Sequence, residues 1–195
     1  MPLRAGRTWL RVLLGGLYPA LIAVSVLFHP ALADQTDARL GKLFARLREA
    51  ADAADAAGIE AEIWGIWGET TGADARSLYA RGMAAMAGGD AQTAAAAFDL
   101  LVQLQPRFAE AWNKRATLKY LMGDDEGSIA DIGRTLMLEP RHFGALSGLA
   151  LILERQGRFG EAVRSLKAAL AVDPHLSGGS ERLRTLEGKA AGDPT

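Results

Sequence analysis

Few side chains in this sequence are of the types that catalyse reactions or hold metal ions. There is no cysteine, which excludes disulfides, thiolate metal ligands and a thiol nucleophile. The histidines are His29, His142 and His175. Because a metal site needs three or four ligands, we interpret His142 and His175 as surface residues in turns. The sequence therefore predicts neither a metal ion nor another cofactor.

The densest group of ionisable side chains is the acidic run Asp124-Asp125-Glu126. A calcium loop needs oxygen ligands at alternate positions over about a dozen residues, and this run does not provide them. Acidic side chains also favour the positive end of a helix dipole. We therefore predict that these residues begin a helix and do not bind a cation.

Other catalytic arrangements are missing as well. The sequence has no glycine-rich phosphate loop, and no serine stands in a nucleophile elbow. Without a cysteine, and with no histidine in the predicted repeat helices, a nucleophile–base pair is difficult to build. These observations predict that the protein is not an enzyme. The less favoured alternative is an enzyme that uses a carboxylate pair without a recognisable motif.

Composition favours a helical protein that does not bind nucleic acid. The chain has 195 residues, of which 49% are hydrophobic, too many for a disordered chain. Aromatic residues make up only 7%, and a low content of β-branched and aromatic residues favours helices over a sheet. The formal net charge is −1, and the basic residues are dispersed, so nucleic acid is not an expected partner.

A spacing of 34 residues organises most of the chain. It separates Pro106 from Pro140 and Pro140 from Pro174. The same spacing relates small residues, turn glycines and large apolar residues: Gly82, Ala116 and Ala150; Gly89, Gly123 and Gly157; Ala94, Ser128 and Ala162; Leu78, Trp112 and Leu146; Phe98, Ile132 and Leu166. Small residues allow two helices to approach closely, glycine tolerates the left-handed conformation at a helix end, and proline ends the second helix.

This pattern resembles the tetratricopeptide repeat, a pair of antiparallel helices. The middle copy carries the resemblance most fully, through Ala111, Trp112, Ala116, Tyr120, Gly123, Asp124, Ser128, Ile132 and Pro140. Leu101 and Thr135 depart from it, because they stand where the family usually has a small residue. The resemblance implies an all-α, right-handed α-solenoid of antiparallel helix pairs. Its three full repeats would cover 75–108, 109–142 and 143–176 within a domain at 73–176. First helices are expected near 75–88, 109–122 and 143–156, and second helices near 91–104, 125–138 and 159–172.

Weaker elements are expected at both ends of the repeats. Residues 34–72 resemble a degenerate helix pair that would cap the start of the array. Its Ile63-Trp64-Gly65-Ile66-Trp67 run is expected to bury apolar surface against the first full repeat. After the last repeat, Leu183 and Leu186 predict a capping helix over 177–188, and a disordered tail is expected over 189–195.

The first 33 residues predict export. Arginines at positions 4, 7 and 11 precede an apolar run over 12–28, and the small residues Ala31 and Ala33 follow it. This order is typical of a secretory signal peptide, so we predict a signal peptide over 1–33, cleavage after Ala33 and a periplasmic protein. The alternative is that the apolar run is retained as a membrane anchor, although it is short for a membrane span and glycine and proline interrupt it.

The family resemblance also assigns a binding surface. First helices line the concave face of such an array, which would bind a peptide or a helix of another protein. Positions not used for packing assign the groove to Arg76, Tyr79, Met83, Met86, Glu110, Asn113, Lys114, Thr117, Ser147, Leu151 and Glu154. Asn113 and Lys114 would hold a peptide backbone or carboxylate, above an apolar floor that includes the methionines.

Some family members clamp a carboxylate with Lys and Asn side chains from three successive helices. Here Tyr79, Met83, Gly144 and Gly148 occupy most of the corresponding places, so a receptor of that type is not favoured. The expected function is a scaffold or assembly factor of the cell envelope, similar to short exported members of the family from Gram-negative bacteria. The partner is an unidentified protein or peptide, and self-association through the apolar ends of the array is a further alternative.

Overall fold

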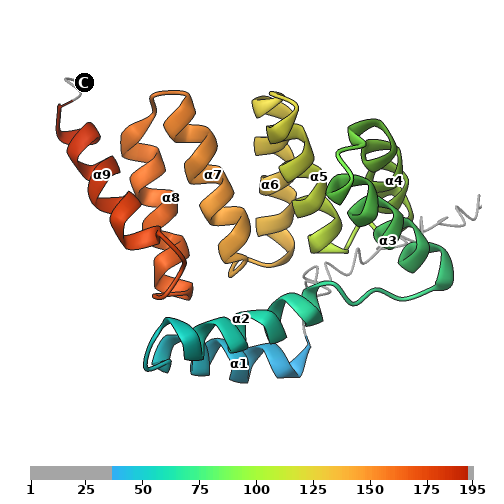
Figure 1. The fold of residues 1–195 in the computed structure, drawn as a ribbon, viewed down its shortest axis with the longest axis horizontal. Coiled ribbons are helices and arrows are strands. Elements are labelled where there is room, and N and C mark those ends of the chain that lie inside the picture. The colour runs from blue at the N-terminus through green and yellow to red at the C-terminus, as the bar shows by residue number, and fades with distance from the viewer. Residues whose placement is uncertain (1–36, 193–195) are drawn as a thin grey trace, which may run out of the picture.

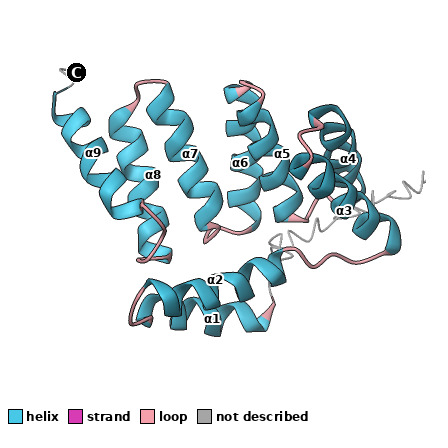
Figure 2. Cartoon of the chain, in the orientation of Figure 1, coloured by secondary structure: helices cyan, strands magenta, loops and turns pink. Residues whose placement is uncertain are grey.

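The computed structural model describes residues 37–192. The predicted signal peptide, the alternative membrane anchor and residues 193–195 of the predicted tail lie outside the described residues. The described part is built of helices, without strands (Figures 1 and 2). The helices are α1 (Ala38–Glu49), α2 (Ala53–Trp67), α3 (Ala73–Ala87), α4 (Ala91–Leu104), α5 (Ala109–Leu121), α6 (Asp125–Leu138), α7 (Phe143–Arg155), α8 (Phe159–Val172) and α9 (Gly179–Gly192).

The repeating residues begin and end the helices as the sequence predicts. Gly89, Gly123 and Gly157 have φ angles of 74°, 83° and 74°, in the left-handed region where glycine avoids a steric penalty. Asp124 is the N-cap of α6 and accepts a hydrogen bond from the backbone N–H of Gly127. Asp125 and Glu126 follow in the first turn, so the prediction that the acidic run begins a helix is confirmed.

The helices from α3 to α8 form three antiparallel pairs that lie side by side in one array (Figure 1). The small residues stand where the two helices of a pair meet. A Cβ atom on Gly82 would lie 2.7 Å from ring carbons of Phe98 on α4, and Ala116 and Ala150 are almost fully buried. The predicted all-α array of helix pairs is therefore confirmed.

The C-terminal helix is longer than the sequence predicts. Leu186 of α9 is completely buried in a cluster with Leu166 of α8, as expected of a capping helix. The expectation of disorder from residue 189 is wrong, because α9 continues to Gly192. One physical reason is that the Nζ atom of Lys189 lies 2.8 Å from Oε1 of Glu154 on α7, which ties the last turns of α9 to the array.

The N-terminal helices occupy an unexpected place. In Figure 1, α1 and α2 form a hairpin that runs beneath the array, along the edge where the turns between repeats lie. We call these two helices the N-terminal hairpin. Its core includes Phe44, Ile63 and Trp67 and continues into Phe143 of α7, with Val172 and Leu176 packed alongside.

The expectation that the tryptophan run packs against the first full repeat is therefore wrong. The hairpin packs on the third repeat instead, where Phe143 and its neighbours offer an apolar and aromatic surface. The return of the chain to α3 passes through Gly72, whose φ of 84° lies in the left-handed region. None of the helices between residues 37 and 192 combines the length and the apolar character that crossing a membrane requires.

Candidate partner-binding site

A cavity of about 280 Å³ lies between α2, α5 and α7, and we call it the α2–α5–α7 cavity. The first helices of the second and third repeats provide most of its wall, with side chains spaced three or four residues apart on one helix face. The residues lining it are Glu60, Trp64, Asn113, Ala116, Thr117, Tyr120, Ser128, Ile132, Phe143, Gly144, Ala145, Ser147, Gly148, Leu151, Ile152 and Leu176.

The structure brings together only part of the predicted groove. Asn113, Thr117, Ser147 and Leu151 line the cavity. The other candidates do not, and among them Glu110 and Lys114 belong to the polar cluster described below. The side chains of Tyr79, Met83 and Met86 pack against the core cluster of the first repeat. Arg76 is exposed on α3. Glu154 pairs with Arg182 and Lys189 of α9.

Two cavity residues, Glu60 and Trp64, come from the N-terminal hairpin and were not among the sequence candidates. Periodicity shows that α2 has an apolar face, but it does not show which surface that face covers. Sequence reasoning placed the hairpin against the first repeat, so it assigned no hairpin residue to the groove. The signal that could have found them is Gly144, since a glycine early in a helix provides space for a large side chain from elsewhere.

Glu110 lies at the centre of a buried polar cluster beside the cavity. Its carboxylate accepts hydrogen bonds from Nδ2 of Asn113 at 2.9 Å and Nε2 of His142 at 3.0 Å, and lies 2.9 Å from Nζ of Lys114. The Nδ1 atom of His142 accepts the backbone N–H of Ala145 at 3.1 Å, so the ring proton is on Nε2. Burial acts to raise the pKa of Glu110, but His142 and Lys114 outweigh burial and lower this pKa.

This cluster corrects two interpretations. Glu110 and His142 are 1% and 0% exposed, so Glu110 does not face a partner and His142 is not a surface residue. Asn113 and Lys114 were expected to hold a peptide backbone or carboxylate, but Glu110 already engages both side chains. The residue types that suggested peptide recognition instead stabilise the joint between α5 and the start of α7.

The same cluster forms the seat of the N-terminal hairpin. The ring of Trp67 stacks on His142, with centroids 4.1 Å apart and planes 8° apart. Trp64 contacts the edge of His142, and Nζ of Lys114 lies 5.1 Å from the Trp64 ring centroid. A Cβ atom on Gly144 would lie 2.6 Å from Cη2 of Trp64. The array is therefore shaped to receive the two tryptophans.

Two carboxyl groups meet where the hairpin contacts the end of α8. Glu60 of α2 faces Asp173, and we call them the carboxyl pair. Burial raises the pKa of both groups, and the charge of Asp173 raises that of Glu60 further. Asp173 is 0% exposed, so a substrate could not reach both carboxyl groups. This geometry does not support the alternative of a carboxylate-pair enzyme at this position.

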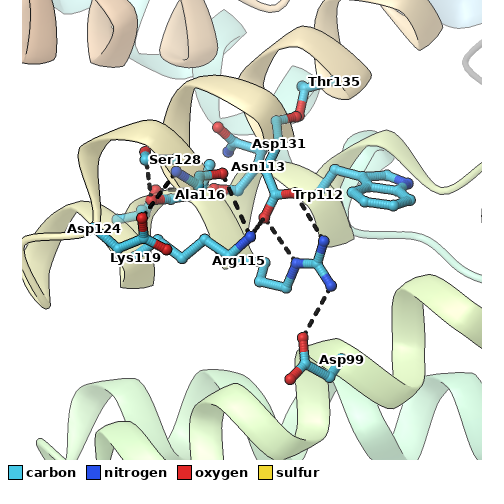
Figure 3. A network of polar contacts seen from close by, with 12 residues as sticks. Asp99, Trp112, Asn113, Arg115, Ala116, Lys119, Asp124, Ser128, Asp131 and Thr135 are labelled. Carbon is cyan, nitrogen blue, oxygen red and sulfur yellow. Dashed lines mark hydrogen bonds and ion pairs between the residues drawn. The ribbon is translucent and has the colours of Figure 1, made fainter.

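A second polar network lies on the side of the second helices and is structural (Figure 3). Arg115 of α5 donates to both carboxylate oxygens of Asp131 on α6 at 2.7 Å. It also donates to Asp99 of α4 at 2.9 Å, and Nζ of Lys119 lies 2.9 Å from Asp131. These contacts join the first and second repeats. Residues 37–192 contain no group of three or more His, Asp or Glu side chains placed to hold a metal ion.

Comparison with known proteins supports the same family at two levels. The tetratricopeptide-repeat family model matches residues 143–176. A TPR repeat-containing protein of Rhizobium etli is 35% identical over 160 residues, which cover 80% of this chain and 77% of that protein.

Solved structures share the fold at low sequence identity. The TPR2B domain of yeast Sti1, in a complex with pHsp70, is 20% identical and has a TM-score of 0.55, with 62% of this chain and 98% of that chain covered. The first TPR of Spaghetti (RPAP3), bound to the HSP90 peptide SRMEEVD, is 16% identical with a TM-score of 0.58, covering 60% and 94%. Together with the periodic sequence and the helix pairs described above, these findings show that the chain belongs to the tetratricopeptide-repeat family.

Proposed function

We propose that this protein is a non-enzymatic scaffold or assembly factor that binds a segment of another protein in the α2–α5–α7 cavity. Tetratricopeptide arrays are protein interaction modules that use their first-helix face. The observation that supports this site most strongly is the open space that remains between α2, α5 and α7 although the hairpin is docked. Most of the polar side chains beside it are already satisfied, so the site is suited to recognition by shape and apolar contact.

The size and chemistry of the cavity favour a protein side chain over a cofactor. Its volume of about 280 Å³ is below the usual range of small-molecule pockets, about 300–1,000 Å³. Leu151 and Tyr120 provide apolar surface, while Thr117 and Ser147 contribute hydroxyl groups. One large apolar side chain of a peptide or helix would fill this space, and the flanking backbone would lie along the open rim.

An acidic C-terminal tail is not the partner that this site favours. The Spaghetti (RPAP3) domain was solved with the peptide SRMEEVD, which ends in carboxylates. Here Lys114 lies against Glu110 and Trp64, so its charge is already balanced. Gly144 and Gly148 have no side chain to offer to a carboxylate. The cation density that an acidic tail requires is therefore lacking in this cavity.

The test is crosslinking in cells that produce the full chain, followed by identification of the crosslinked proteins. The cavity is blocked by Thr117→Trp, and Thr185→Trp on α9 is the matched control. Both threonines are exposed and helical, and each hydroxyl donates to the carbonyl four residues earlier. We expect Thr117→Trp to lose a partner that the control retains. The same partners with both folded variants would contradict the proposal.

The cell envelope is proposed as the place of action because of the predicted signal peptide over residues 1–33. Fractionation and the intact mass of the purified protein test this proposal. A periplasmic protein that begins at Asp34 would support cleavage and export. An uncleaved chain in the membrane fraction would support the alternative, in which residues 12–28 anchor the same array. An uncleaved chain in the cytoplasm would contradict both.

A further inference from the structure

The α2–α5–α7 cavity has an acidic edge that no basic residue of its wall balances. Glu60 is the one carboxylate among the lining residues, and neither Lys nor Arg is among them. Across the hairpin contact lies Asp173, whose Oδ1 accepts the backbone N–H of His175 at 3.0 Å. The Oδ2 atom of Asp173 is buried without a hydrogen-bond donor. Glu60, in contact with Asp173, therefore places an acidic group at the edge of an open cavity.

Basic side chains elsewhere near the cavity are engaged with other groups. Lys114 lies 2.9 Å from Glu110 and over the face of Trp64. Arg155 pairs with Asp125 and lies over the ring of Tyr120, 4.0 Å from its centroid. Neither can turn towards Glu60 without losing these contacts. The basic group that interacts with the carboxyl pair is His175, whose Nε2 atom is engaged with the carbonyl of Ala50. A lysine or arginine beside Glu60 would therefore come from a bound partner.

We propose that the bound segment carries a Lys or Arg next to the apolar side chain that fills the cavity, and that Glu60 pairs with this cation. The inference rests on the proposed function and names the class of partner. A charge-assisted hydrogen bond to Glu60 would be strong, because partial burial reduces the competition from water for this carboxylate. It would also reject acidic segments, since like charges repel in a partly buried site.

The inference gives the N-terminal hairpin a direct part in recognition. The repeats contribute the apolar wall through residues such as Leu151, while the hairpin contributes the charge through Glu60 and an aromatic face through Trp64. The specificity of the array would then depend on a segment that lies outside the three repeats. An array with similar repeats but a different hairpin would select a different partner.

The test is selection of random linear peptides displayed on phage against the full chain at neutral pH. Selected peptides are then measured against Glu60→Gln and against Glu62→Gln as a matched control. Glu62 lies on the same helix, is exposed and pairs only loosely with Arg46, at 3.6 Å. We expect a basic residue beside a large apolar one in the selected peptides. Glu60→Gln should weaken their binding about tenfold, while Glu62→Gln should not change it.

A dependence on pH provides a second readout. Binding should weaken as the pH falls below neutral, because the pKa of Glu60 is raised and protonation removes the charge that holds the cation. Other ionisable groups facing this contact are Asp173 and His175 from the turn after α8, and Asp52, which caps α2. Glu60→Gln should flatten the pH profile of binding. If titration of His175 alone caused the pH dependence, wild type and Glu60→Gln would show the same slope.

The outcomes separate this inference from the proposed function. Peptides that bind wild type but not Thr117→Trp, and that are acidic or neutral, would leave the cavity as the site and overturn its preference for a cation. Basic peptides that bind Glu60→Gln and Glu62→Gln equally would overturn the role of Glu60. If no selected peptide is sensitive to Thr117→Trp, the cavity is not the binding site, and both proposals fail.

Discussion

Glu110 is the residue on which the joint between repeats and hairpin depends. It is almost fully buried and receives polar contacts from Asn113, Lys114 and His142. A buried carboxylate is tolerated when several donors satisfy it. His142 then presents its ring face to Trp67. A single carboxylate thus fixes the surface on which the hairpin rests.

Replacing Glu110 with Ala should therefore destabilise the protein by about 3 kcal/mol, since removal of one partner leaves the other buried polar groups unsatisfied. Urea unfolding followed by circular dichroism measures this change. Glu62→Ala is the control, because its exposed ion pair should contribute less than about 1 kcal/mol. Equal losses in the two variants would show that the Glu110 cluster does not stabilise the fold.

The contributions of Glu110 and Glu60 to stability should depend on pH in opposite directions. The pKa of Glu110 is lowered, so its contribution to stability is present above its ordinary pKa and lost on strong acidification. The pKa of Glu60 is raised, so ionisation of Glu60 costs stability, and this cost appears as the pH rises above the ordinary pKa of glutamate. Glu60→Gln should therefore stabilise the protein at pH 7 by less than about 1 kcal/mol. The gain should disappear near pH 4, as urea midpoints across this range would reveal.

At Gly144, helix α7 leaves space for a side chain of helix α2. In an isolated helix, alanine is favoured over glycine by about 1 kcal/mol. Here the added Cβ would meet the Trp64 ring, so Gly144→Ala should detach or tilt the hairpin instead of stabilising the chain. The readouts are tryptophan fluorescence and protease cleavage between α2 and α3. Gly133→Ala on α6, where nothing lies within 4 Å, should stabilise by about 0.5–1 kcal/mol. A stabilised Gly144→Ala variant with unchanged fluorescence would refute this account.

The helices of the array could be predicted because each boundary has a local cause. Gly123 ends α5 in a left-handed conformation, and Asp124 caps α6, and both causes are visible in the sequence. The place of the hairpin could not be predicted, because the apolar face of α2 is compatible with any apolar surface of the array. For the same reason, the residues that the hairpin contributes to the candidate site could not be predicted. Family positions assigned Thr117 and Leu151 to the groove, and both line the cavity, but these positions did not reveal that Lys114 pairs with Glu110.

At the scale of the whole molecule, the hairpin adds contacts between units that are far apart in sequence, which an ordinary solenoid lacks. In a repeat array each unit contacts only its neighbours. Here the Nε2 atom of His175 donates to the carbonyl of Ala50 at 3.0 Å, across 125 residues of sequence. Figure 1 shows the hairpin spanning beneath the array while its connection to α3 returns to the opposite end. The third repeat is therefore linked to both the hairpin and its own neighbours.

This arrangement predicts that the hairpin can be released while the repeats stay folded. Trp67 is fully buried, and its Nε1 atom has no hydrogen-bond partner, so its contribution comes from packing on His142 and Phe143. Trp67→Ala should cost about 3 kcal/mol. Hydrogen exchange measured by mass spectrometry should show the loss in α1 and α2, with α3 to α6 still protected.

The reciprocal substitution is Leu166→Ala, which removes a buried side chain from the cluster of α7, α8 and α9. That cluster includes part of the surface on which the hairpin packs. Protection from hydrogen exchange should therefore fall in α7 to α9 and in the hairpin together. Trp67→Ala should thus weaken the hairpin alone, whereas Leu166→Ala should weaken both. Uniform loss of protection over residues 37–192 in the Trp67 variant would mean that hairpin and repeats unfold as one unit. In that case the partner could not meet the array without its hairpin, and Glu60 would be a permanent part of the cavity wall.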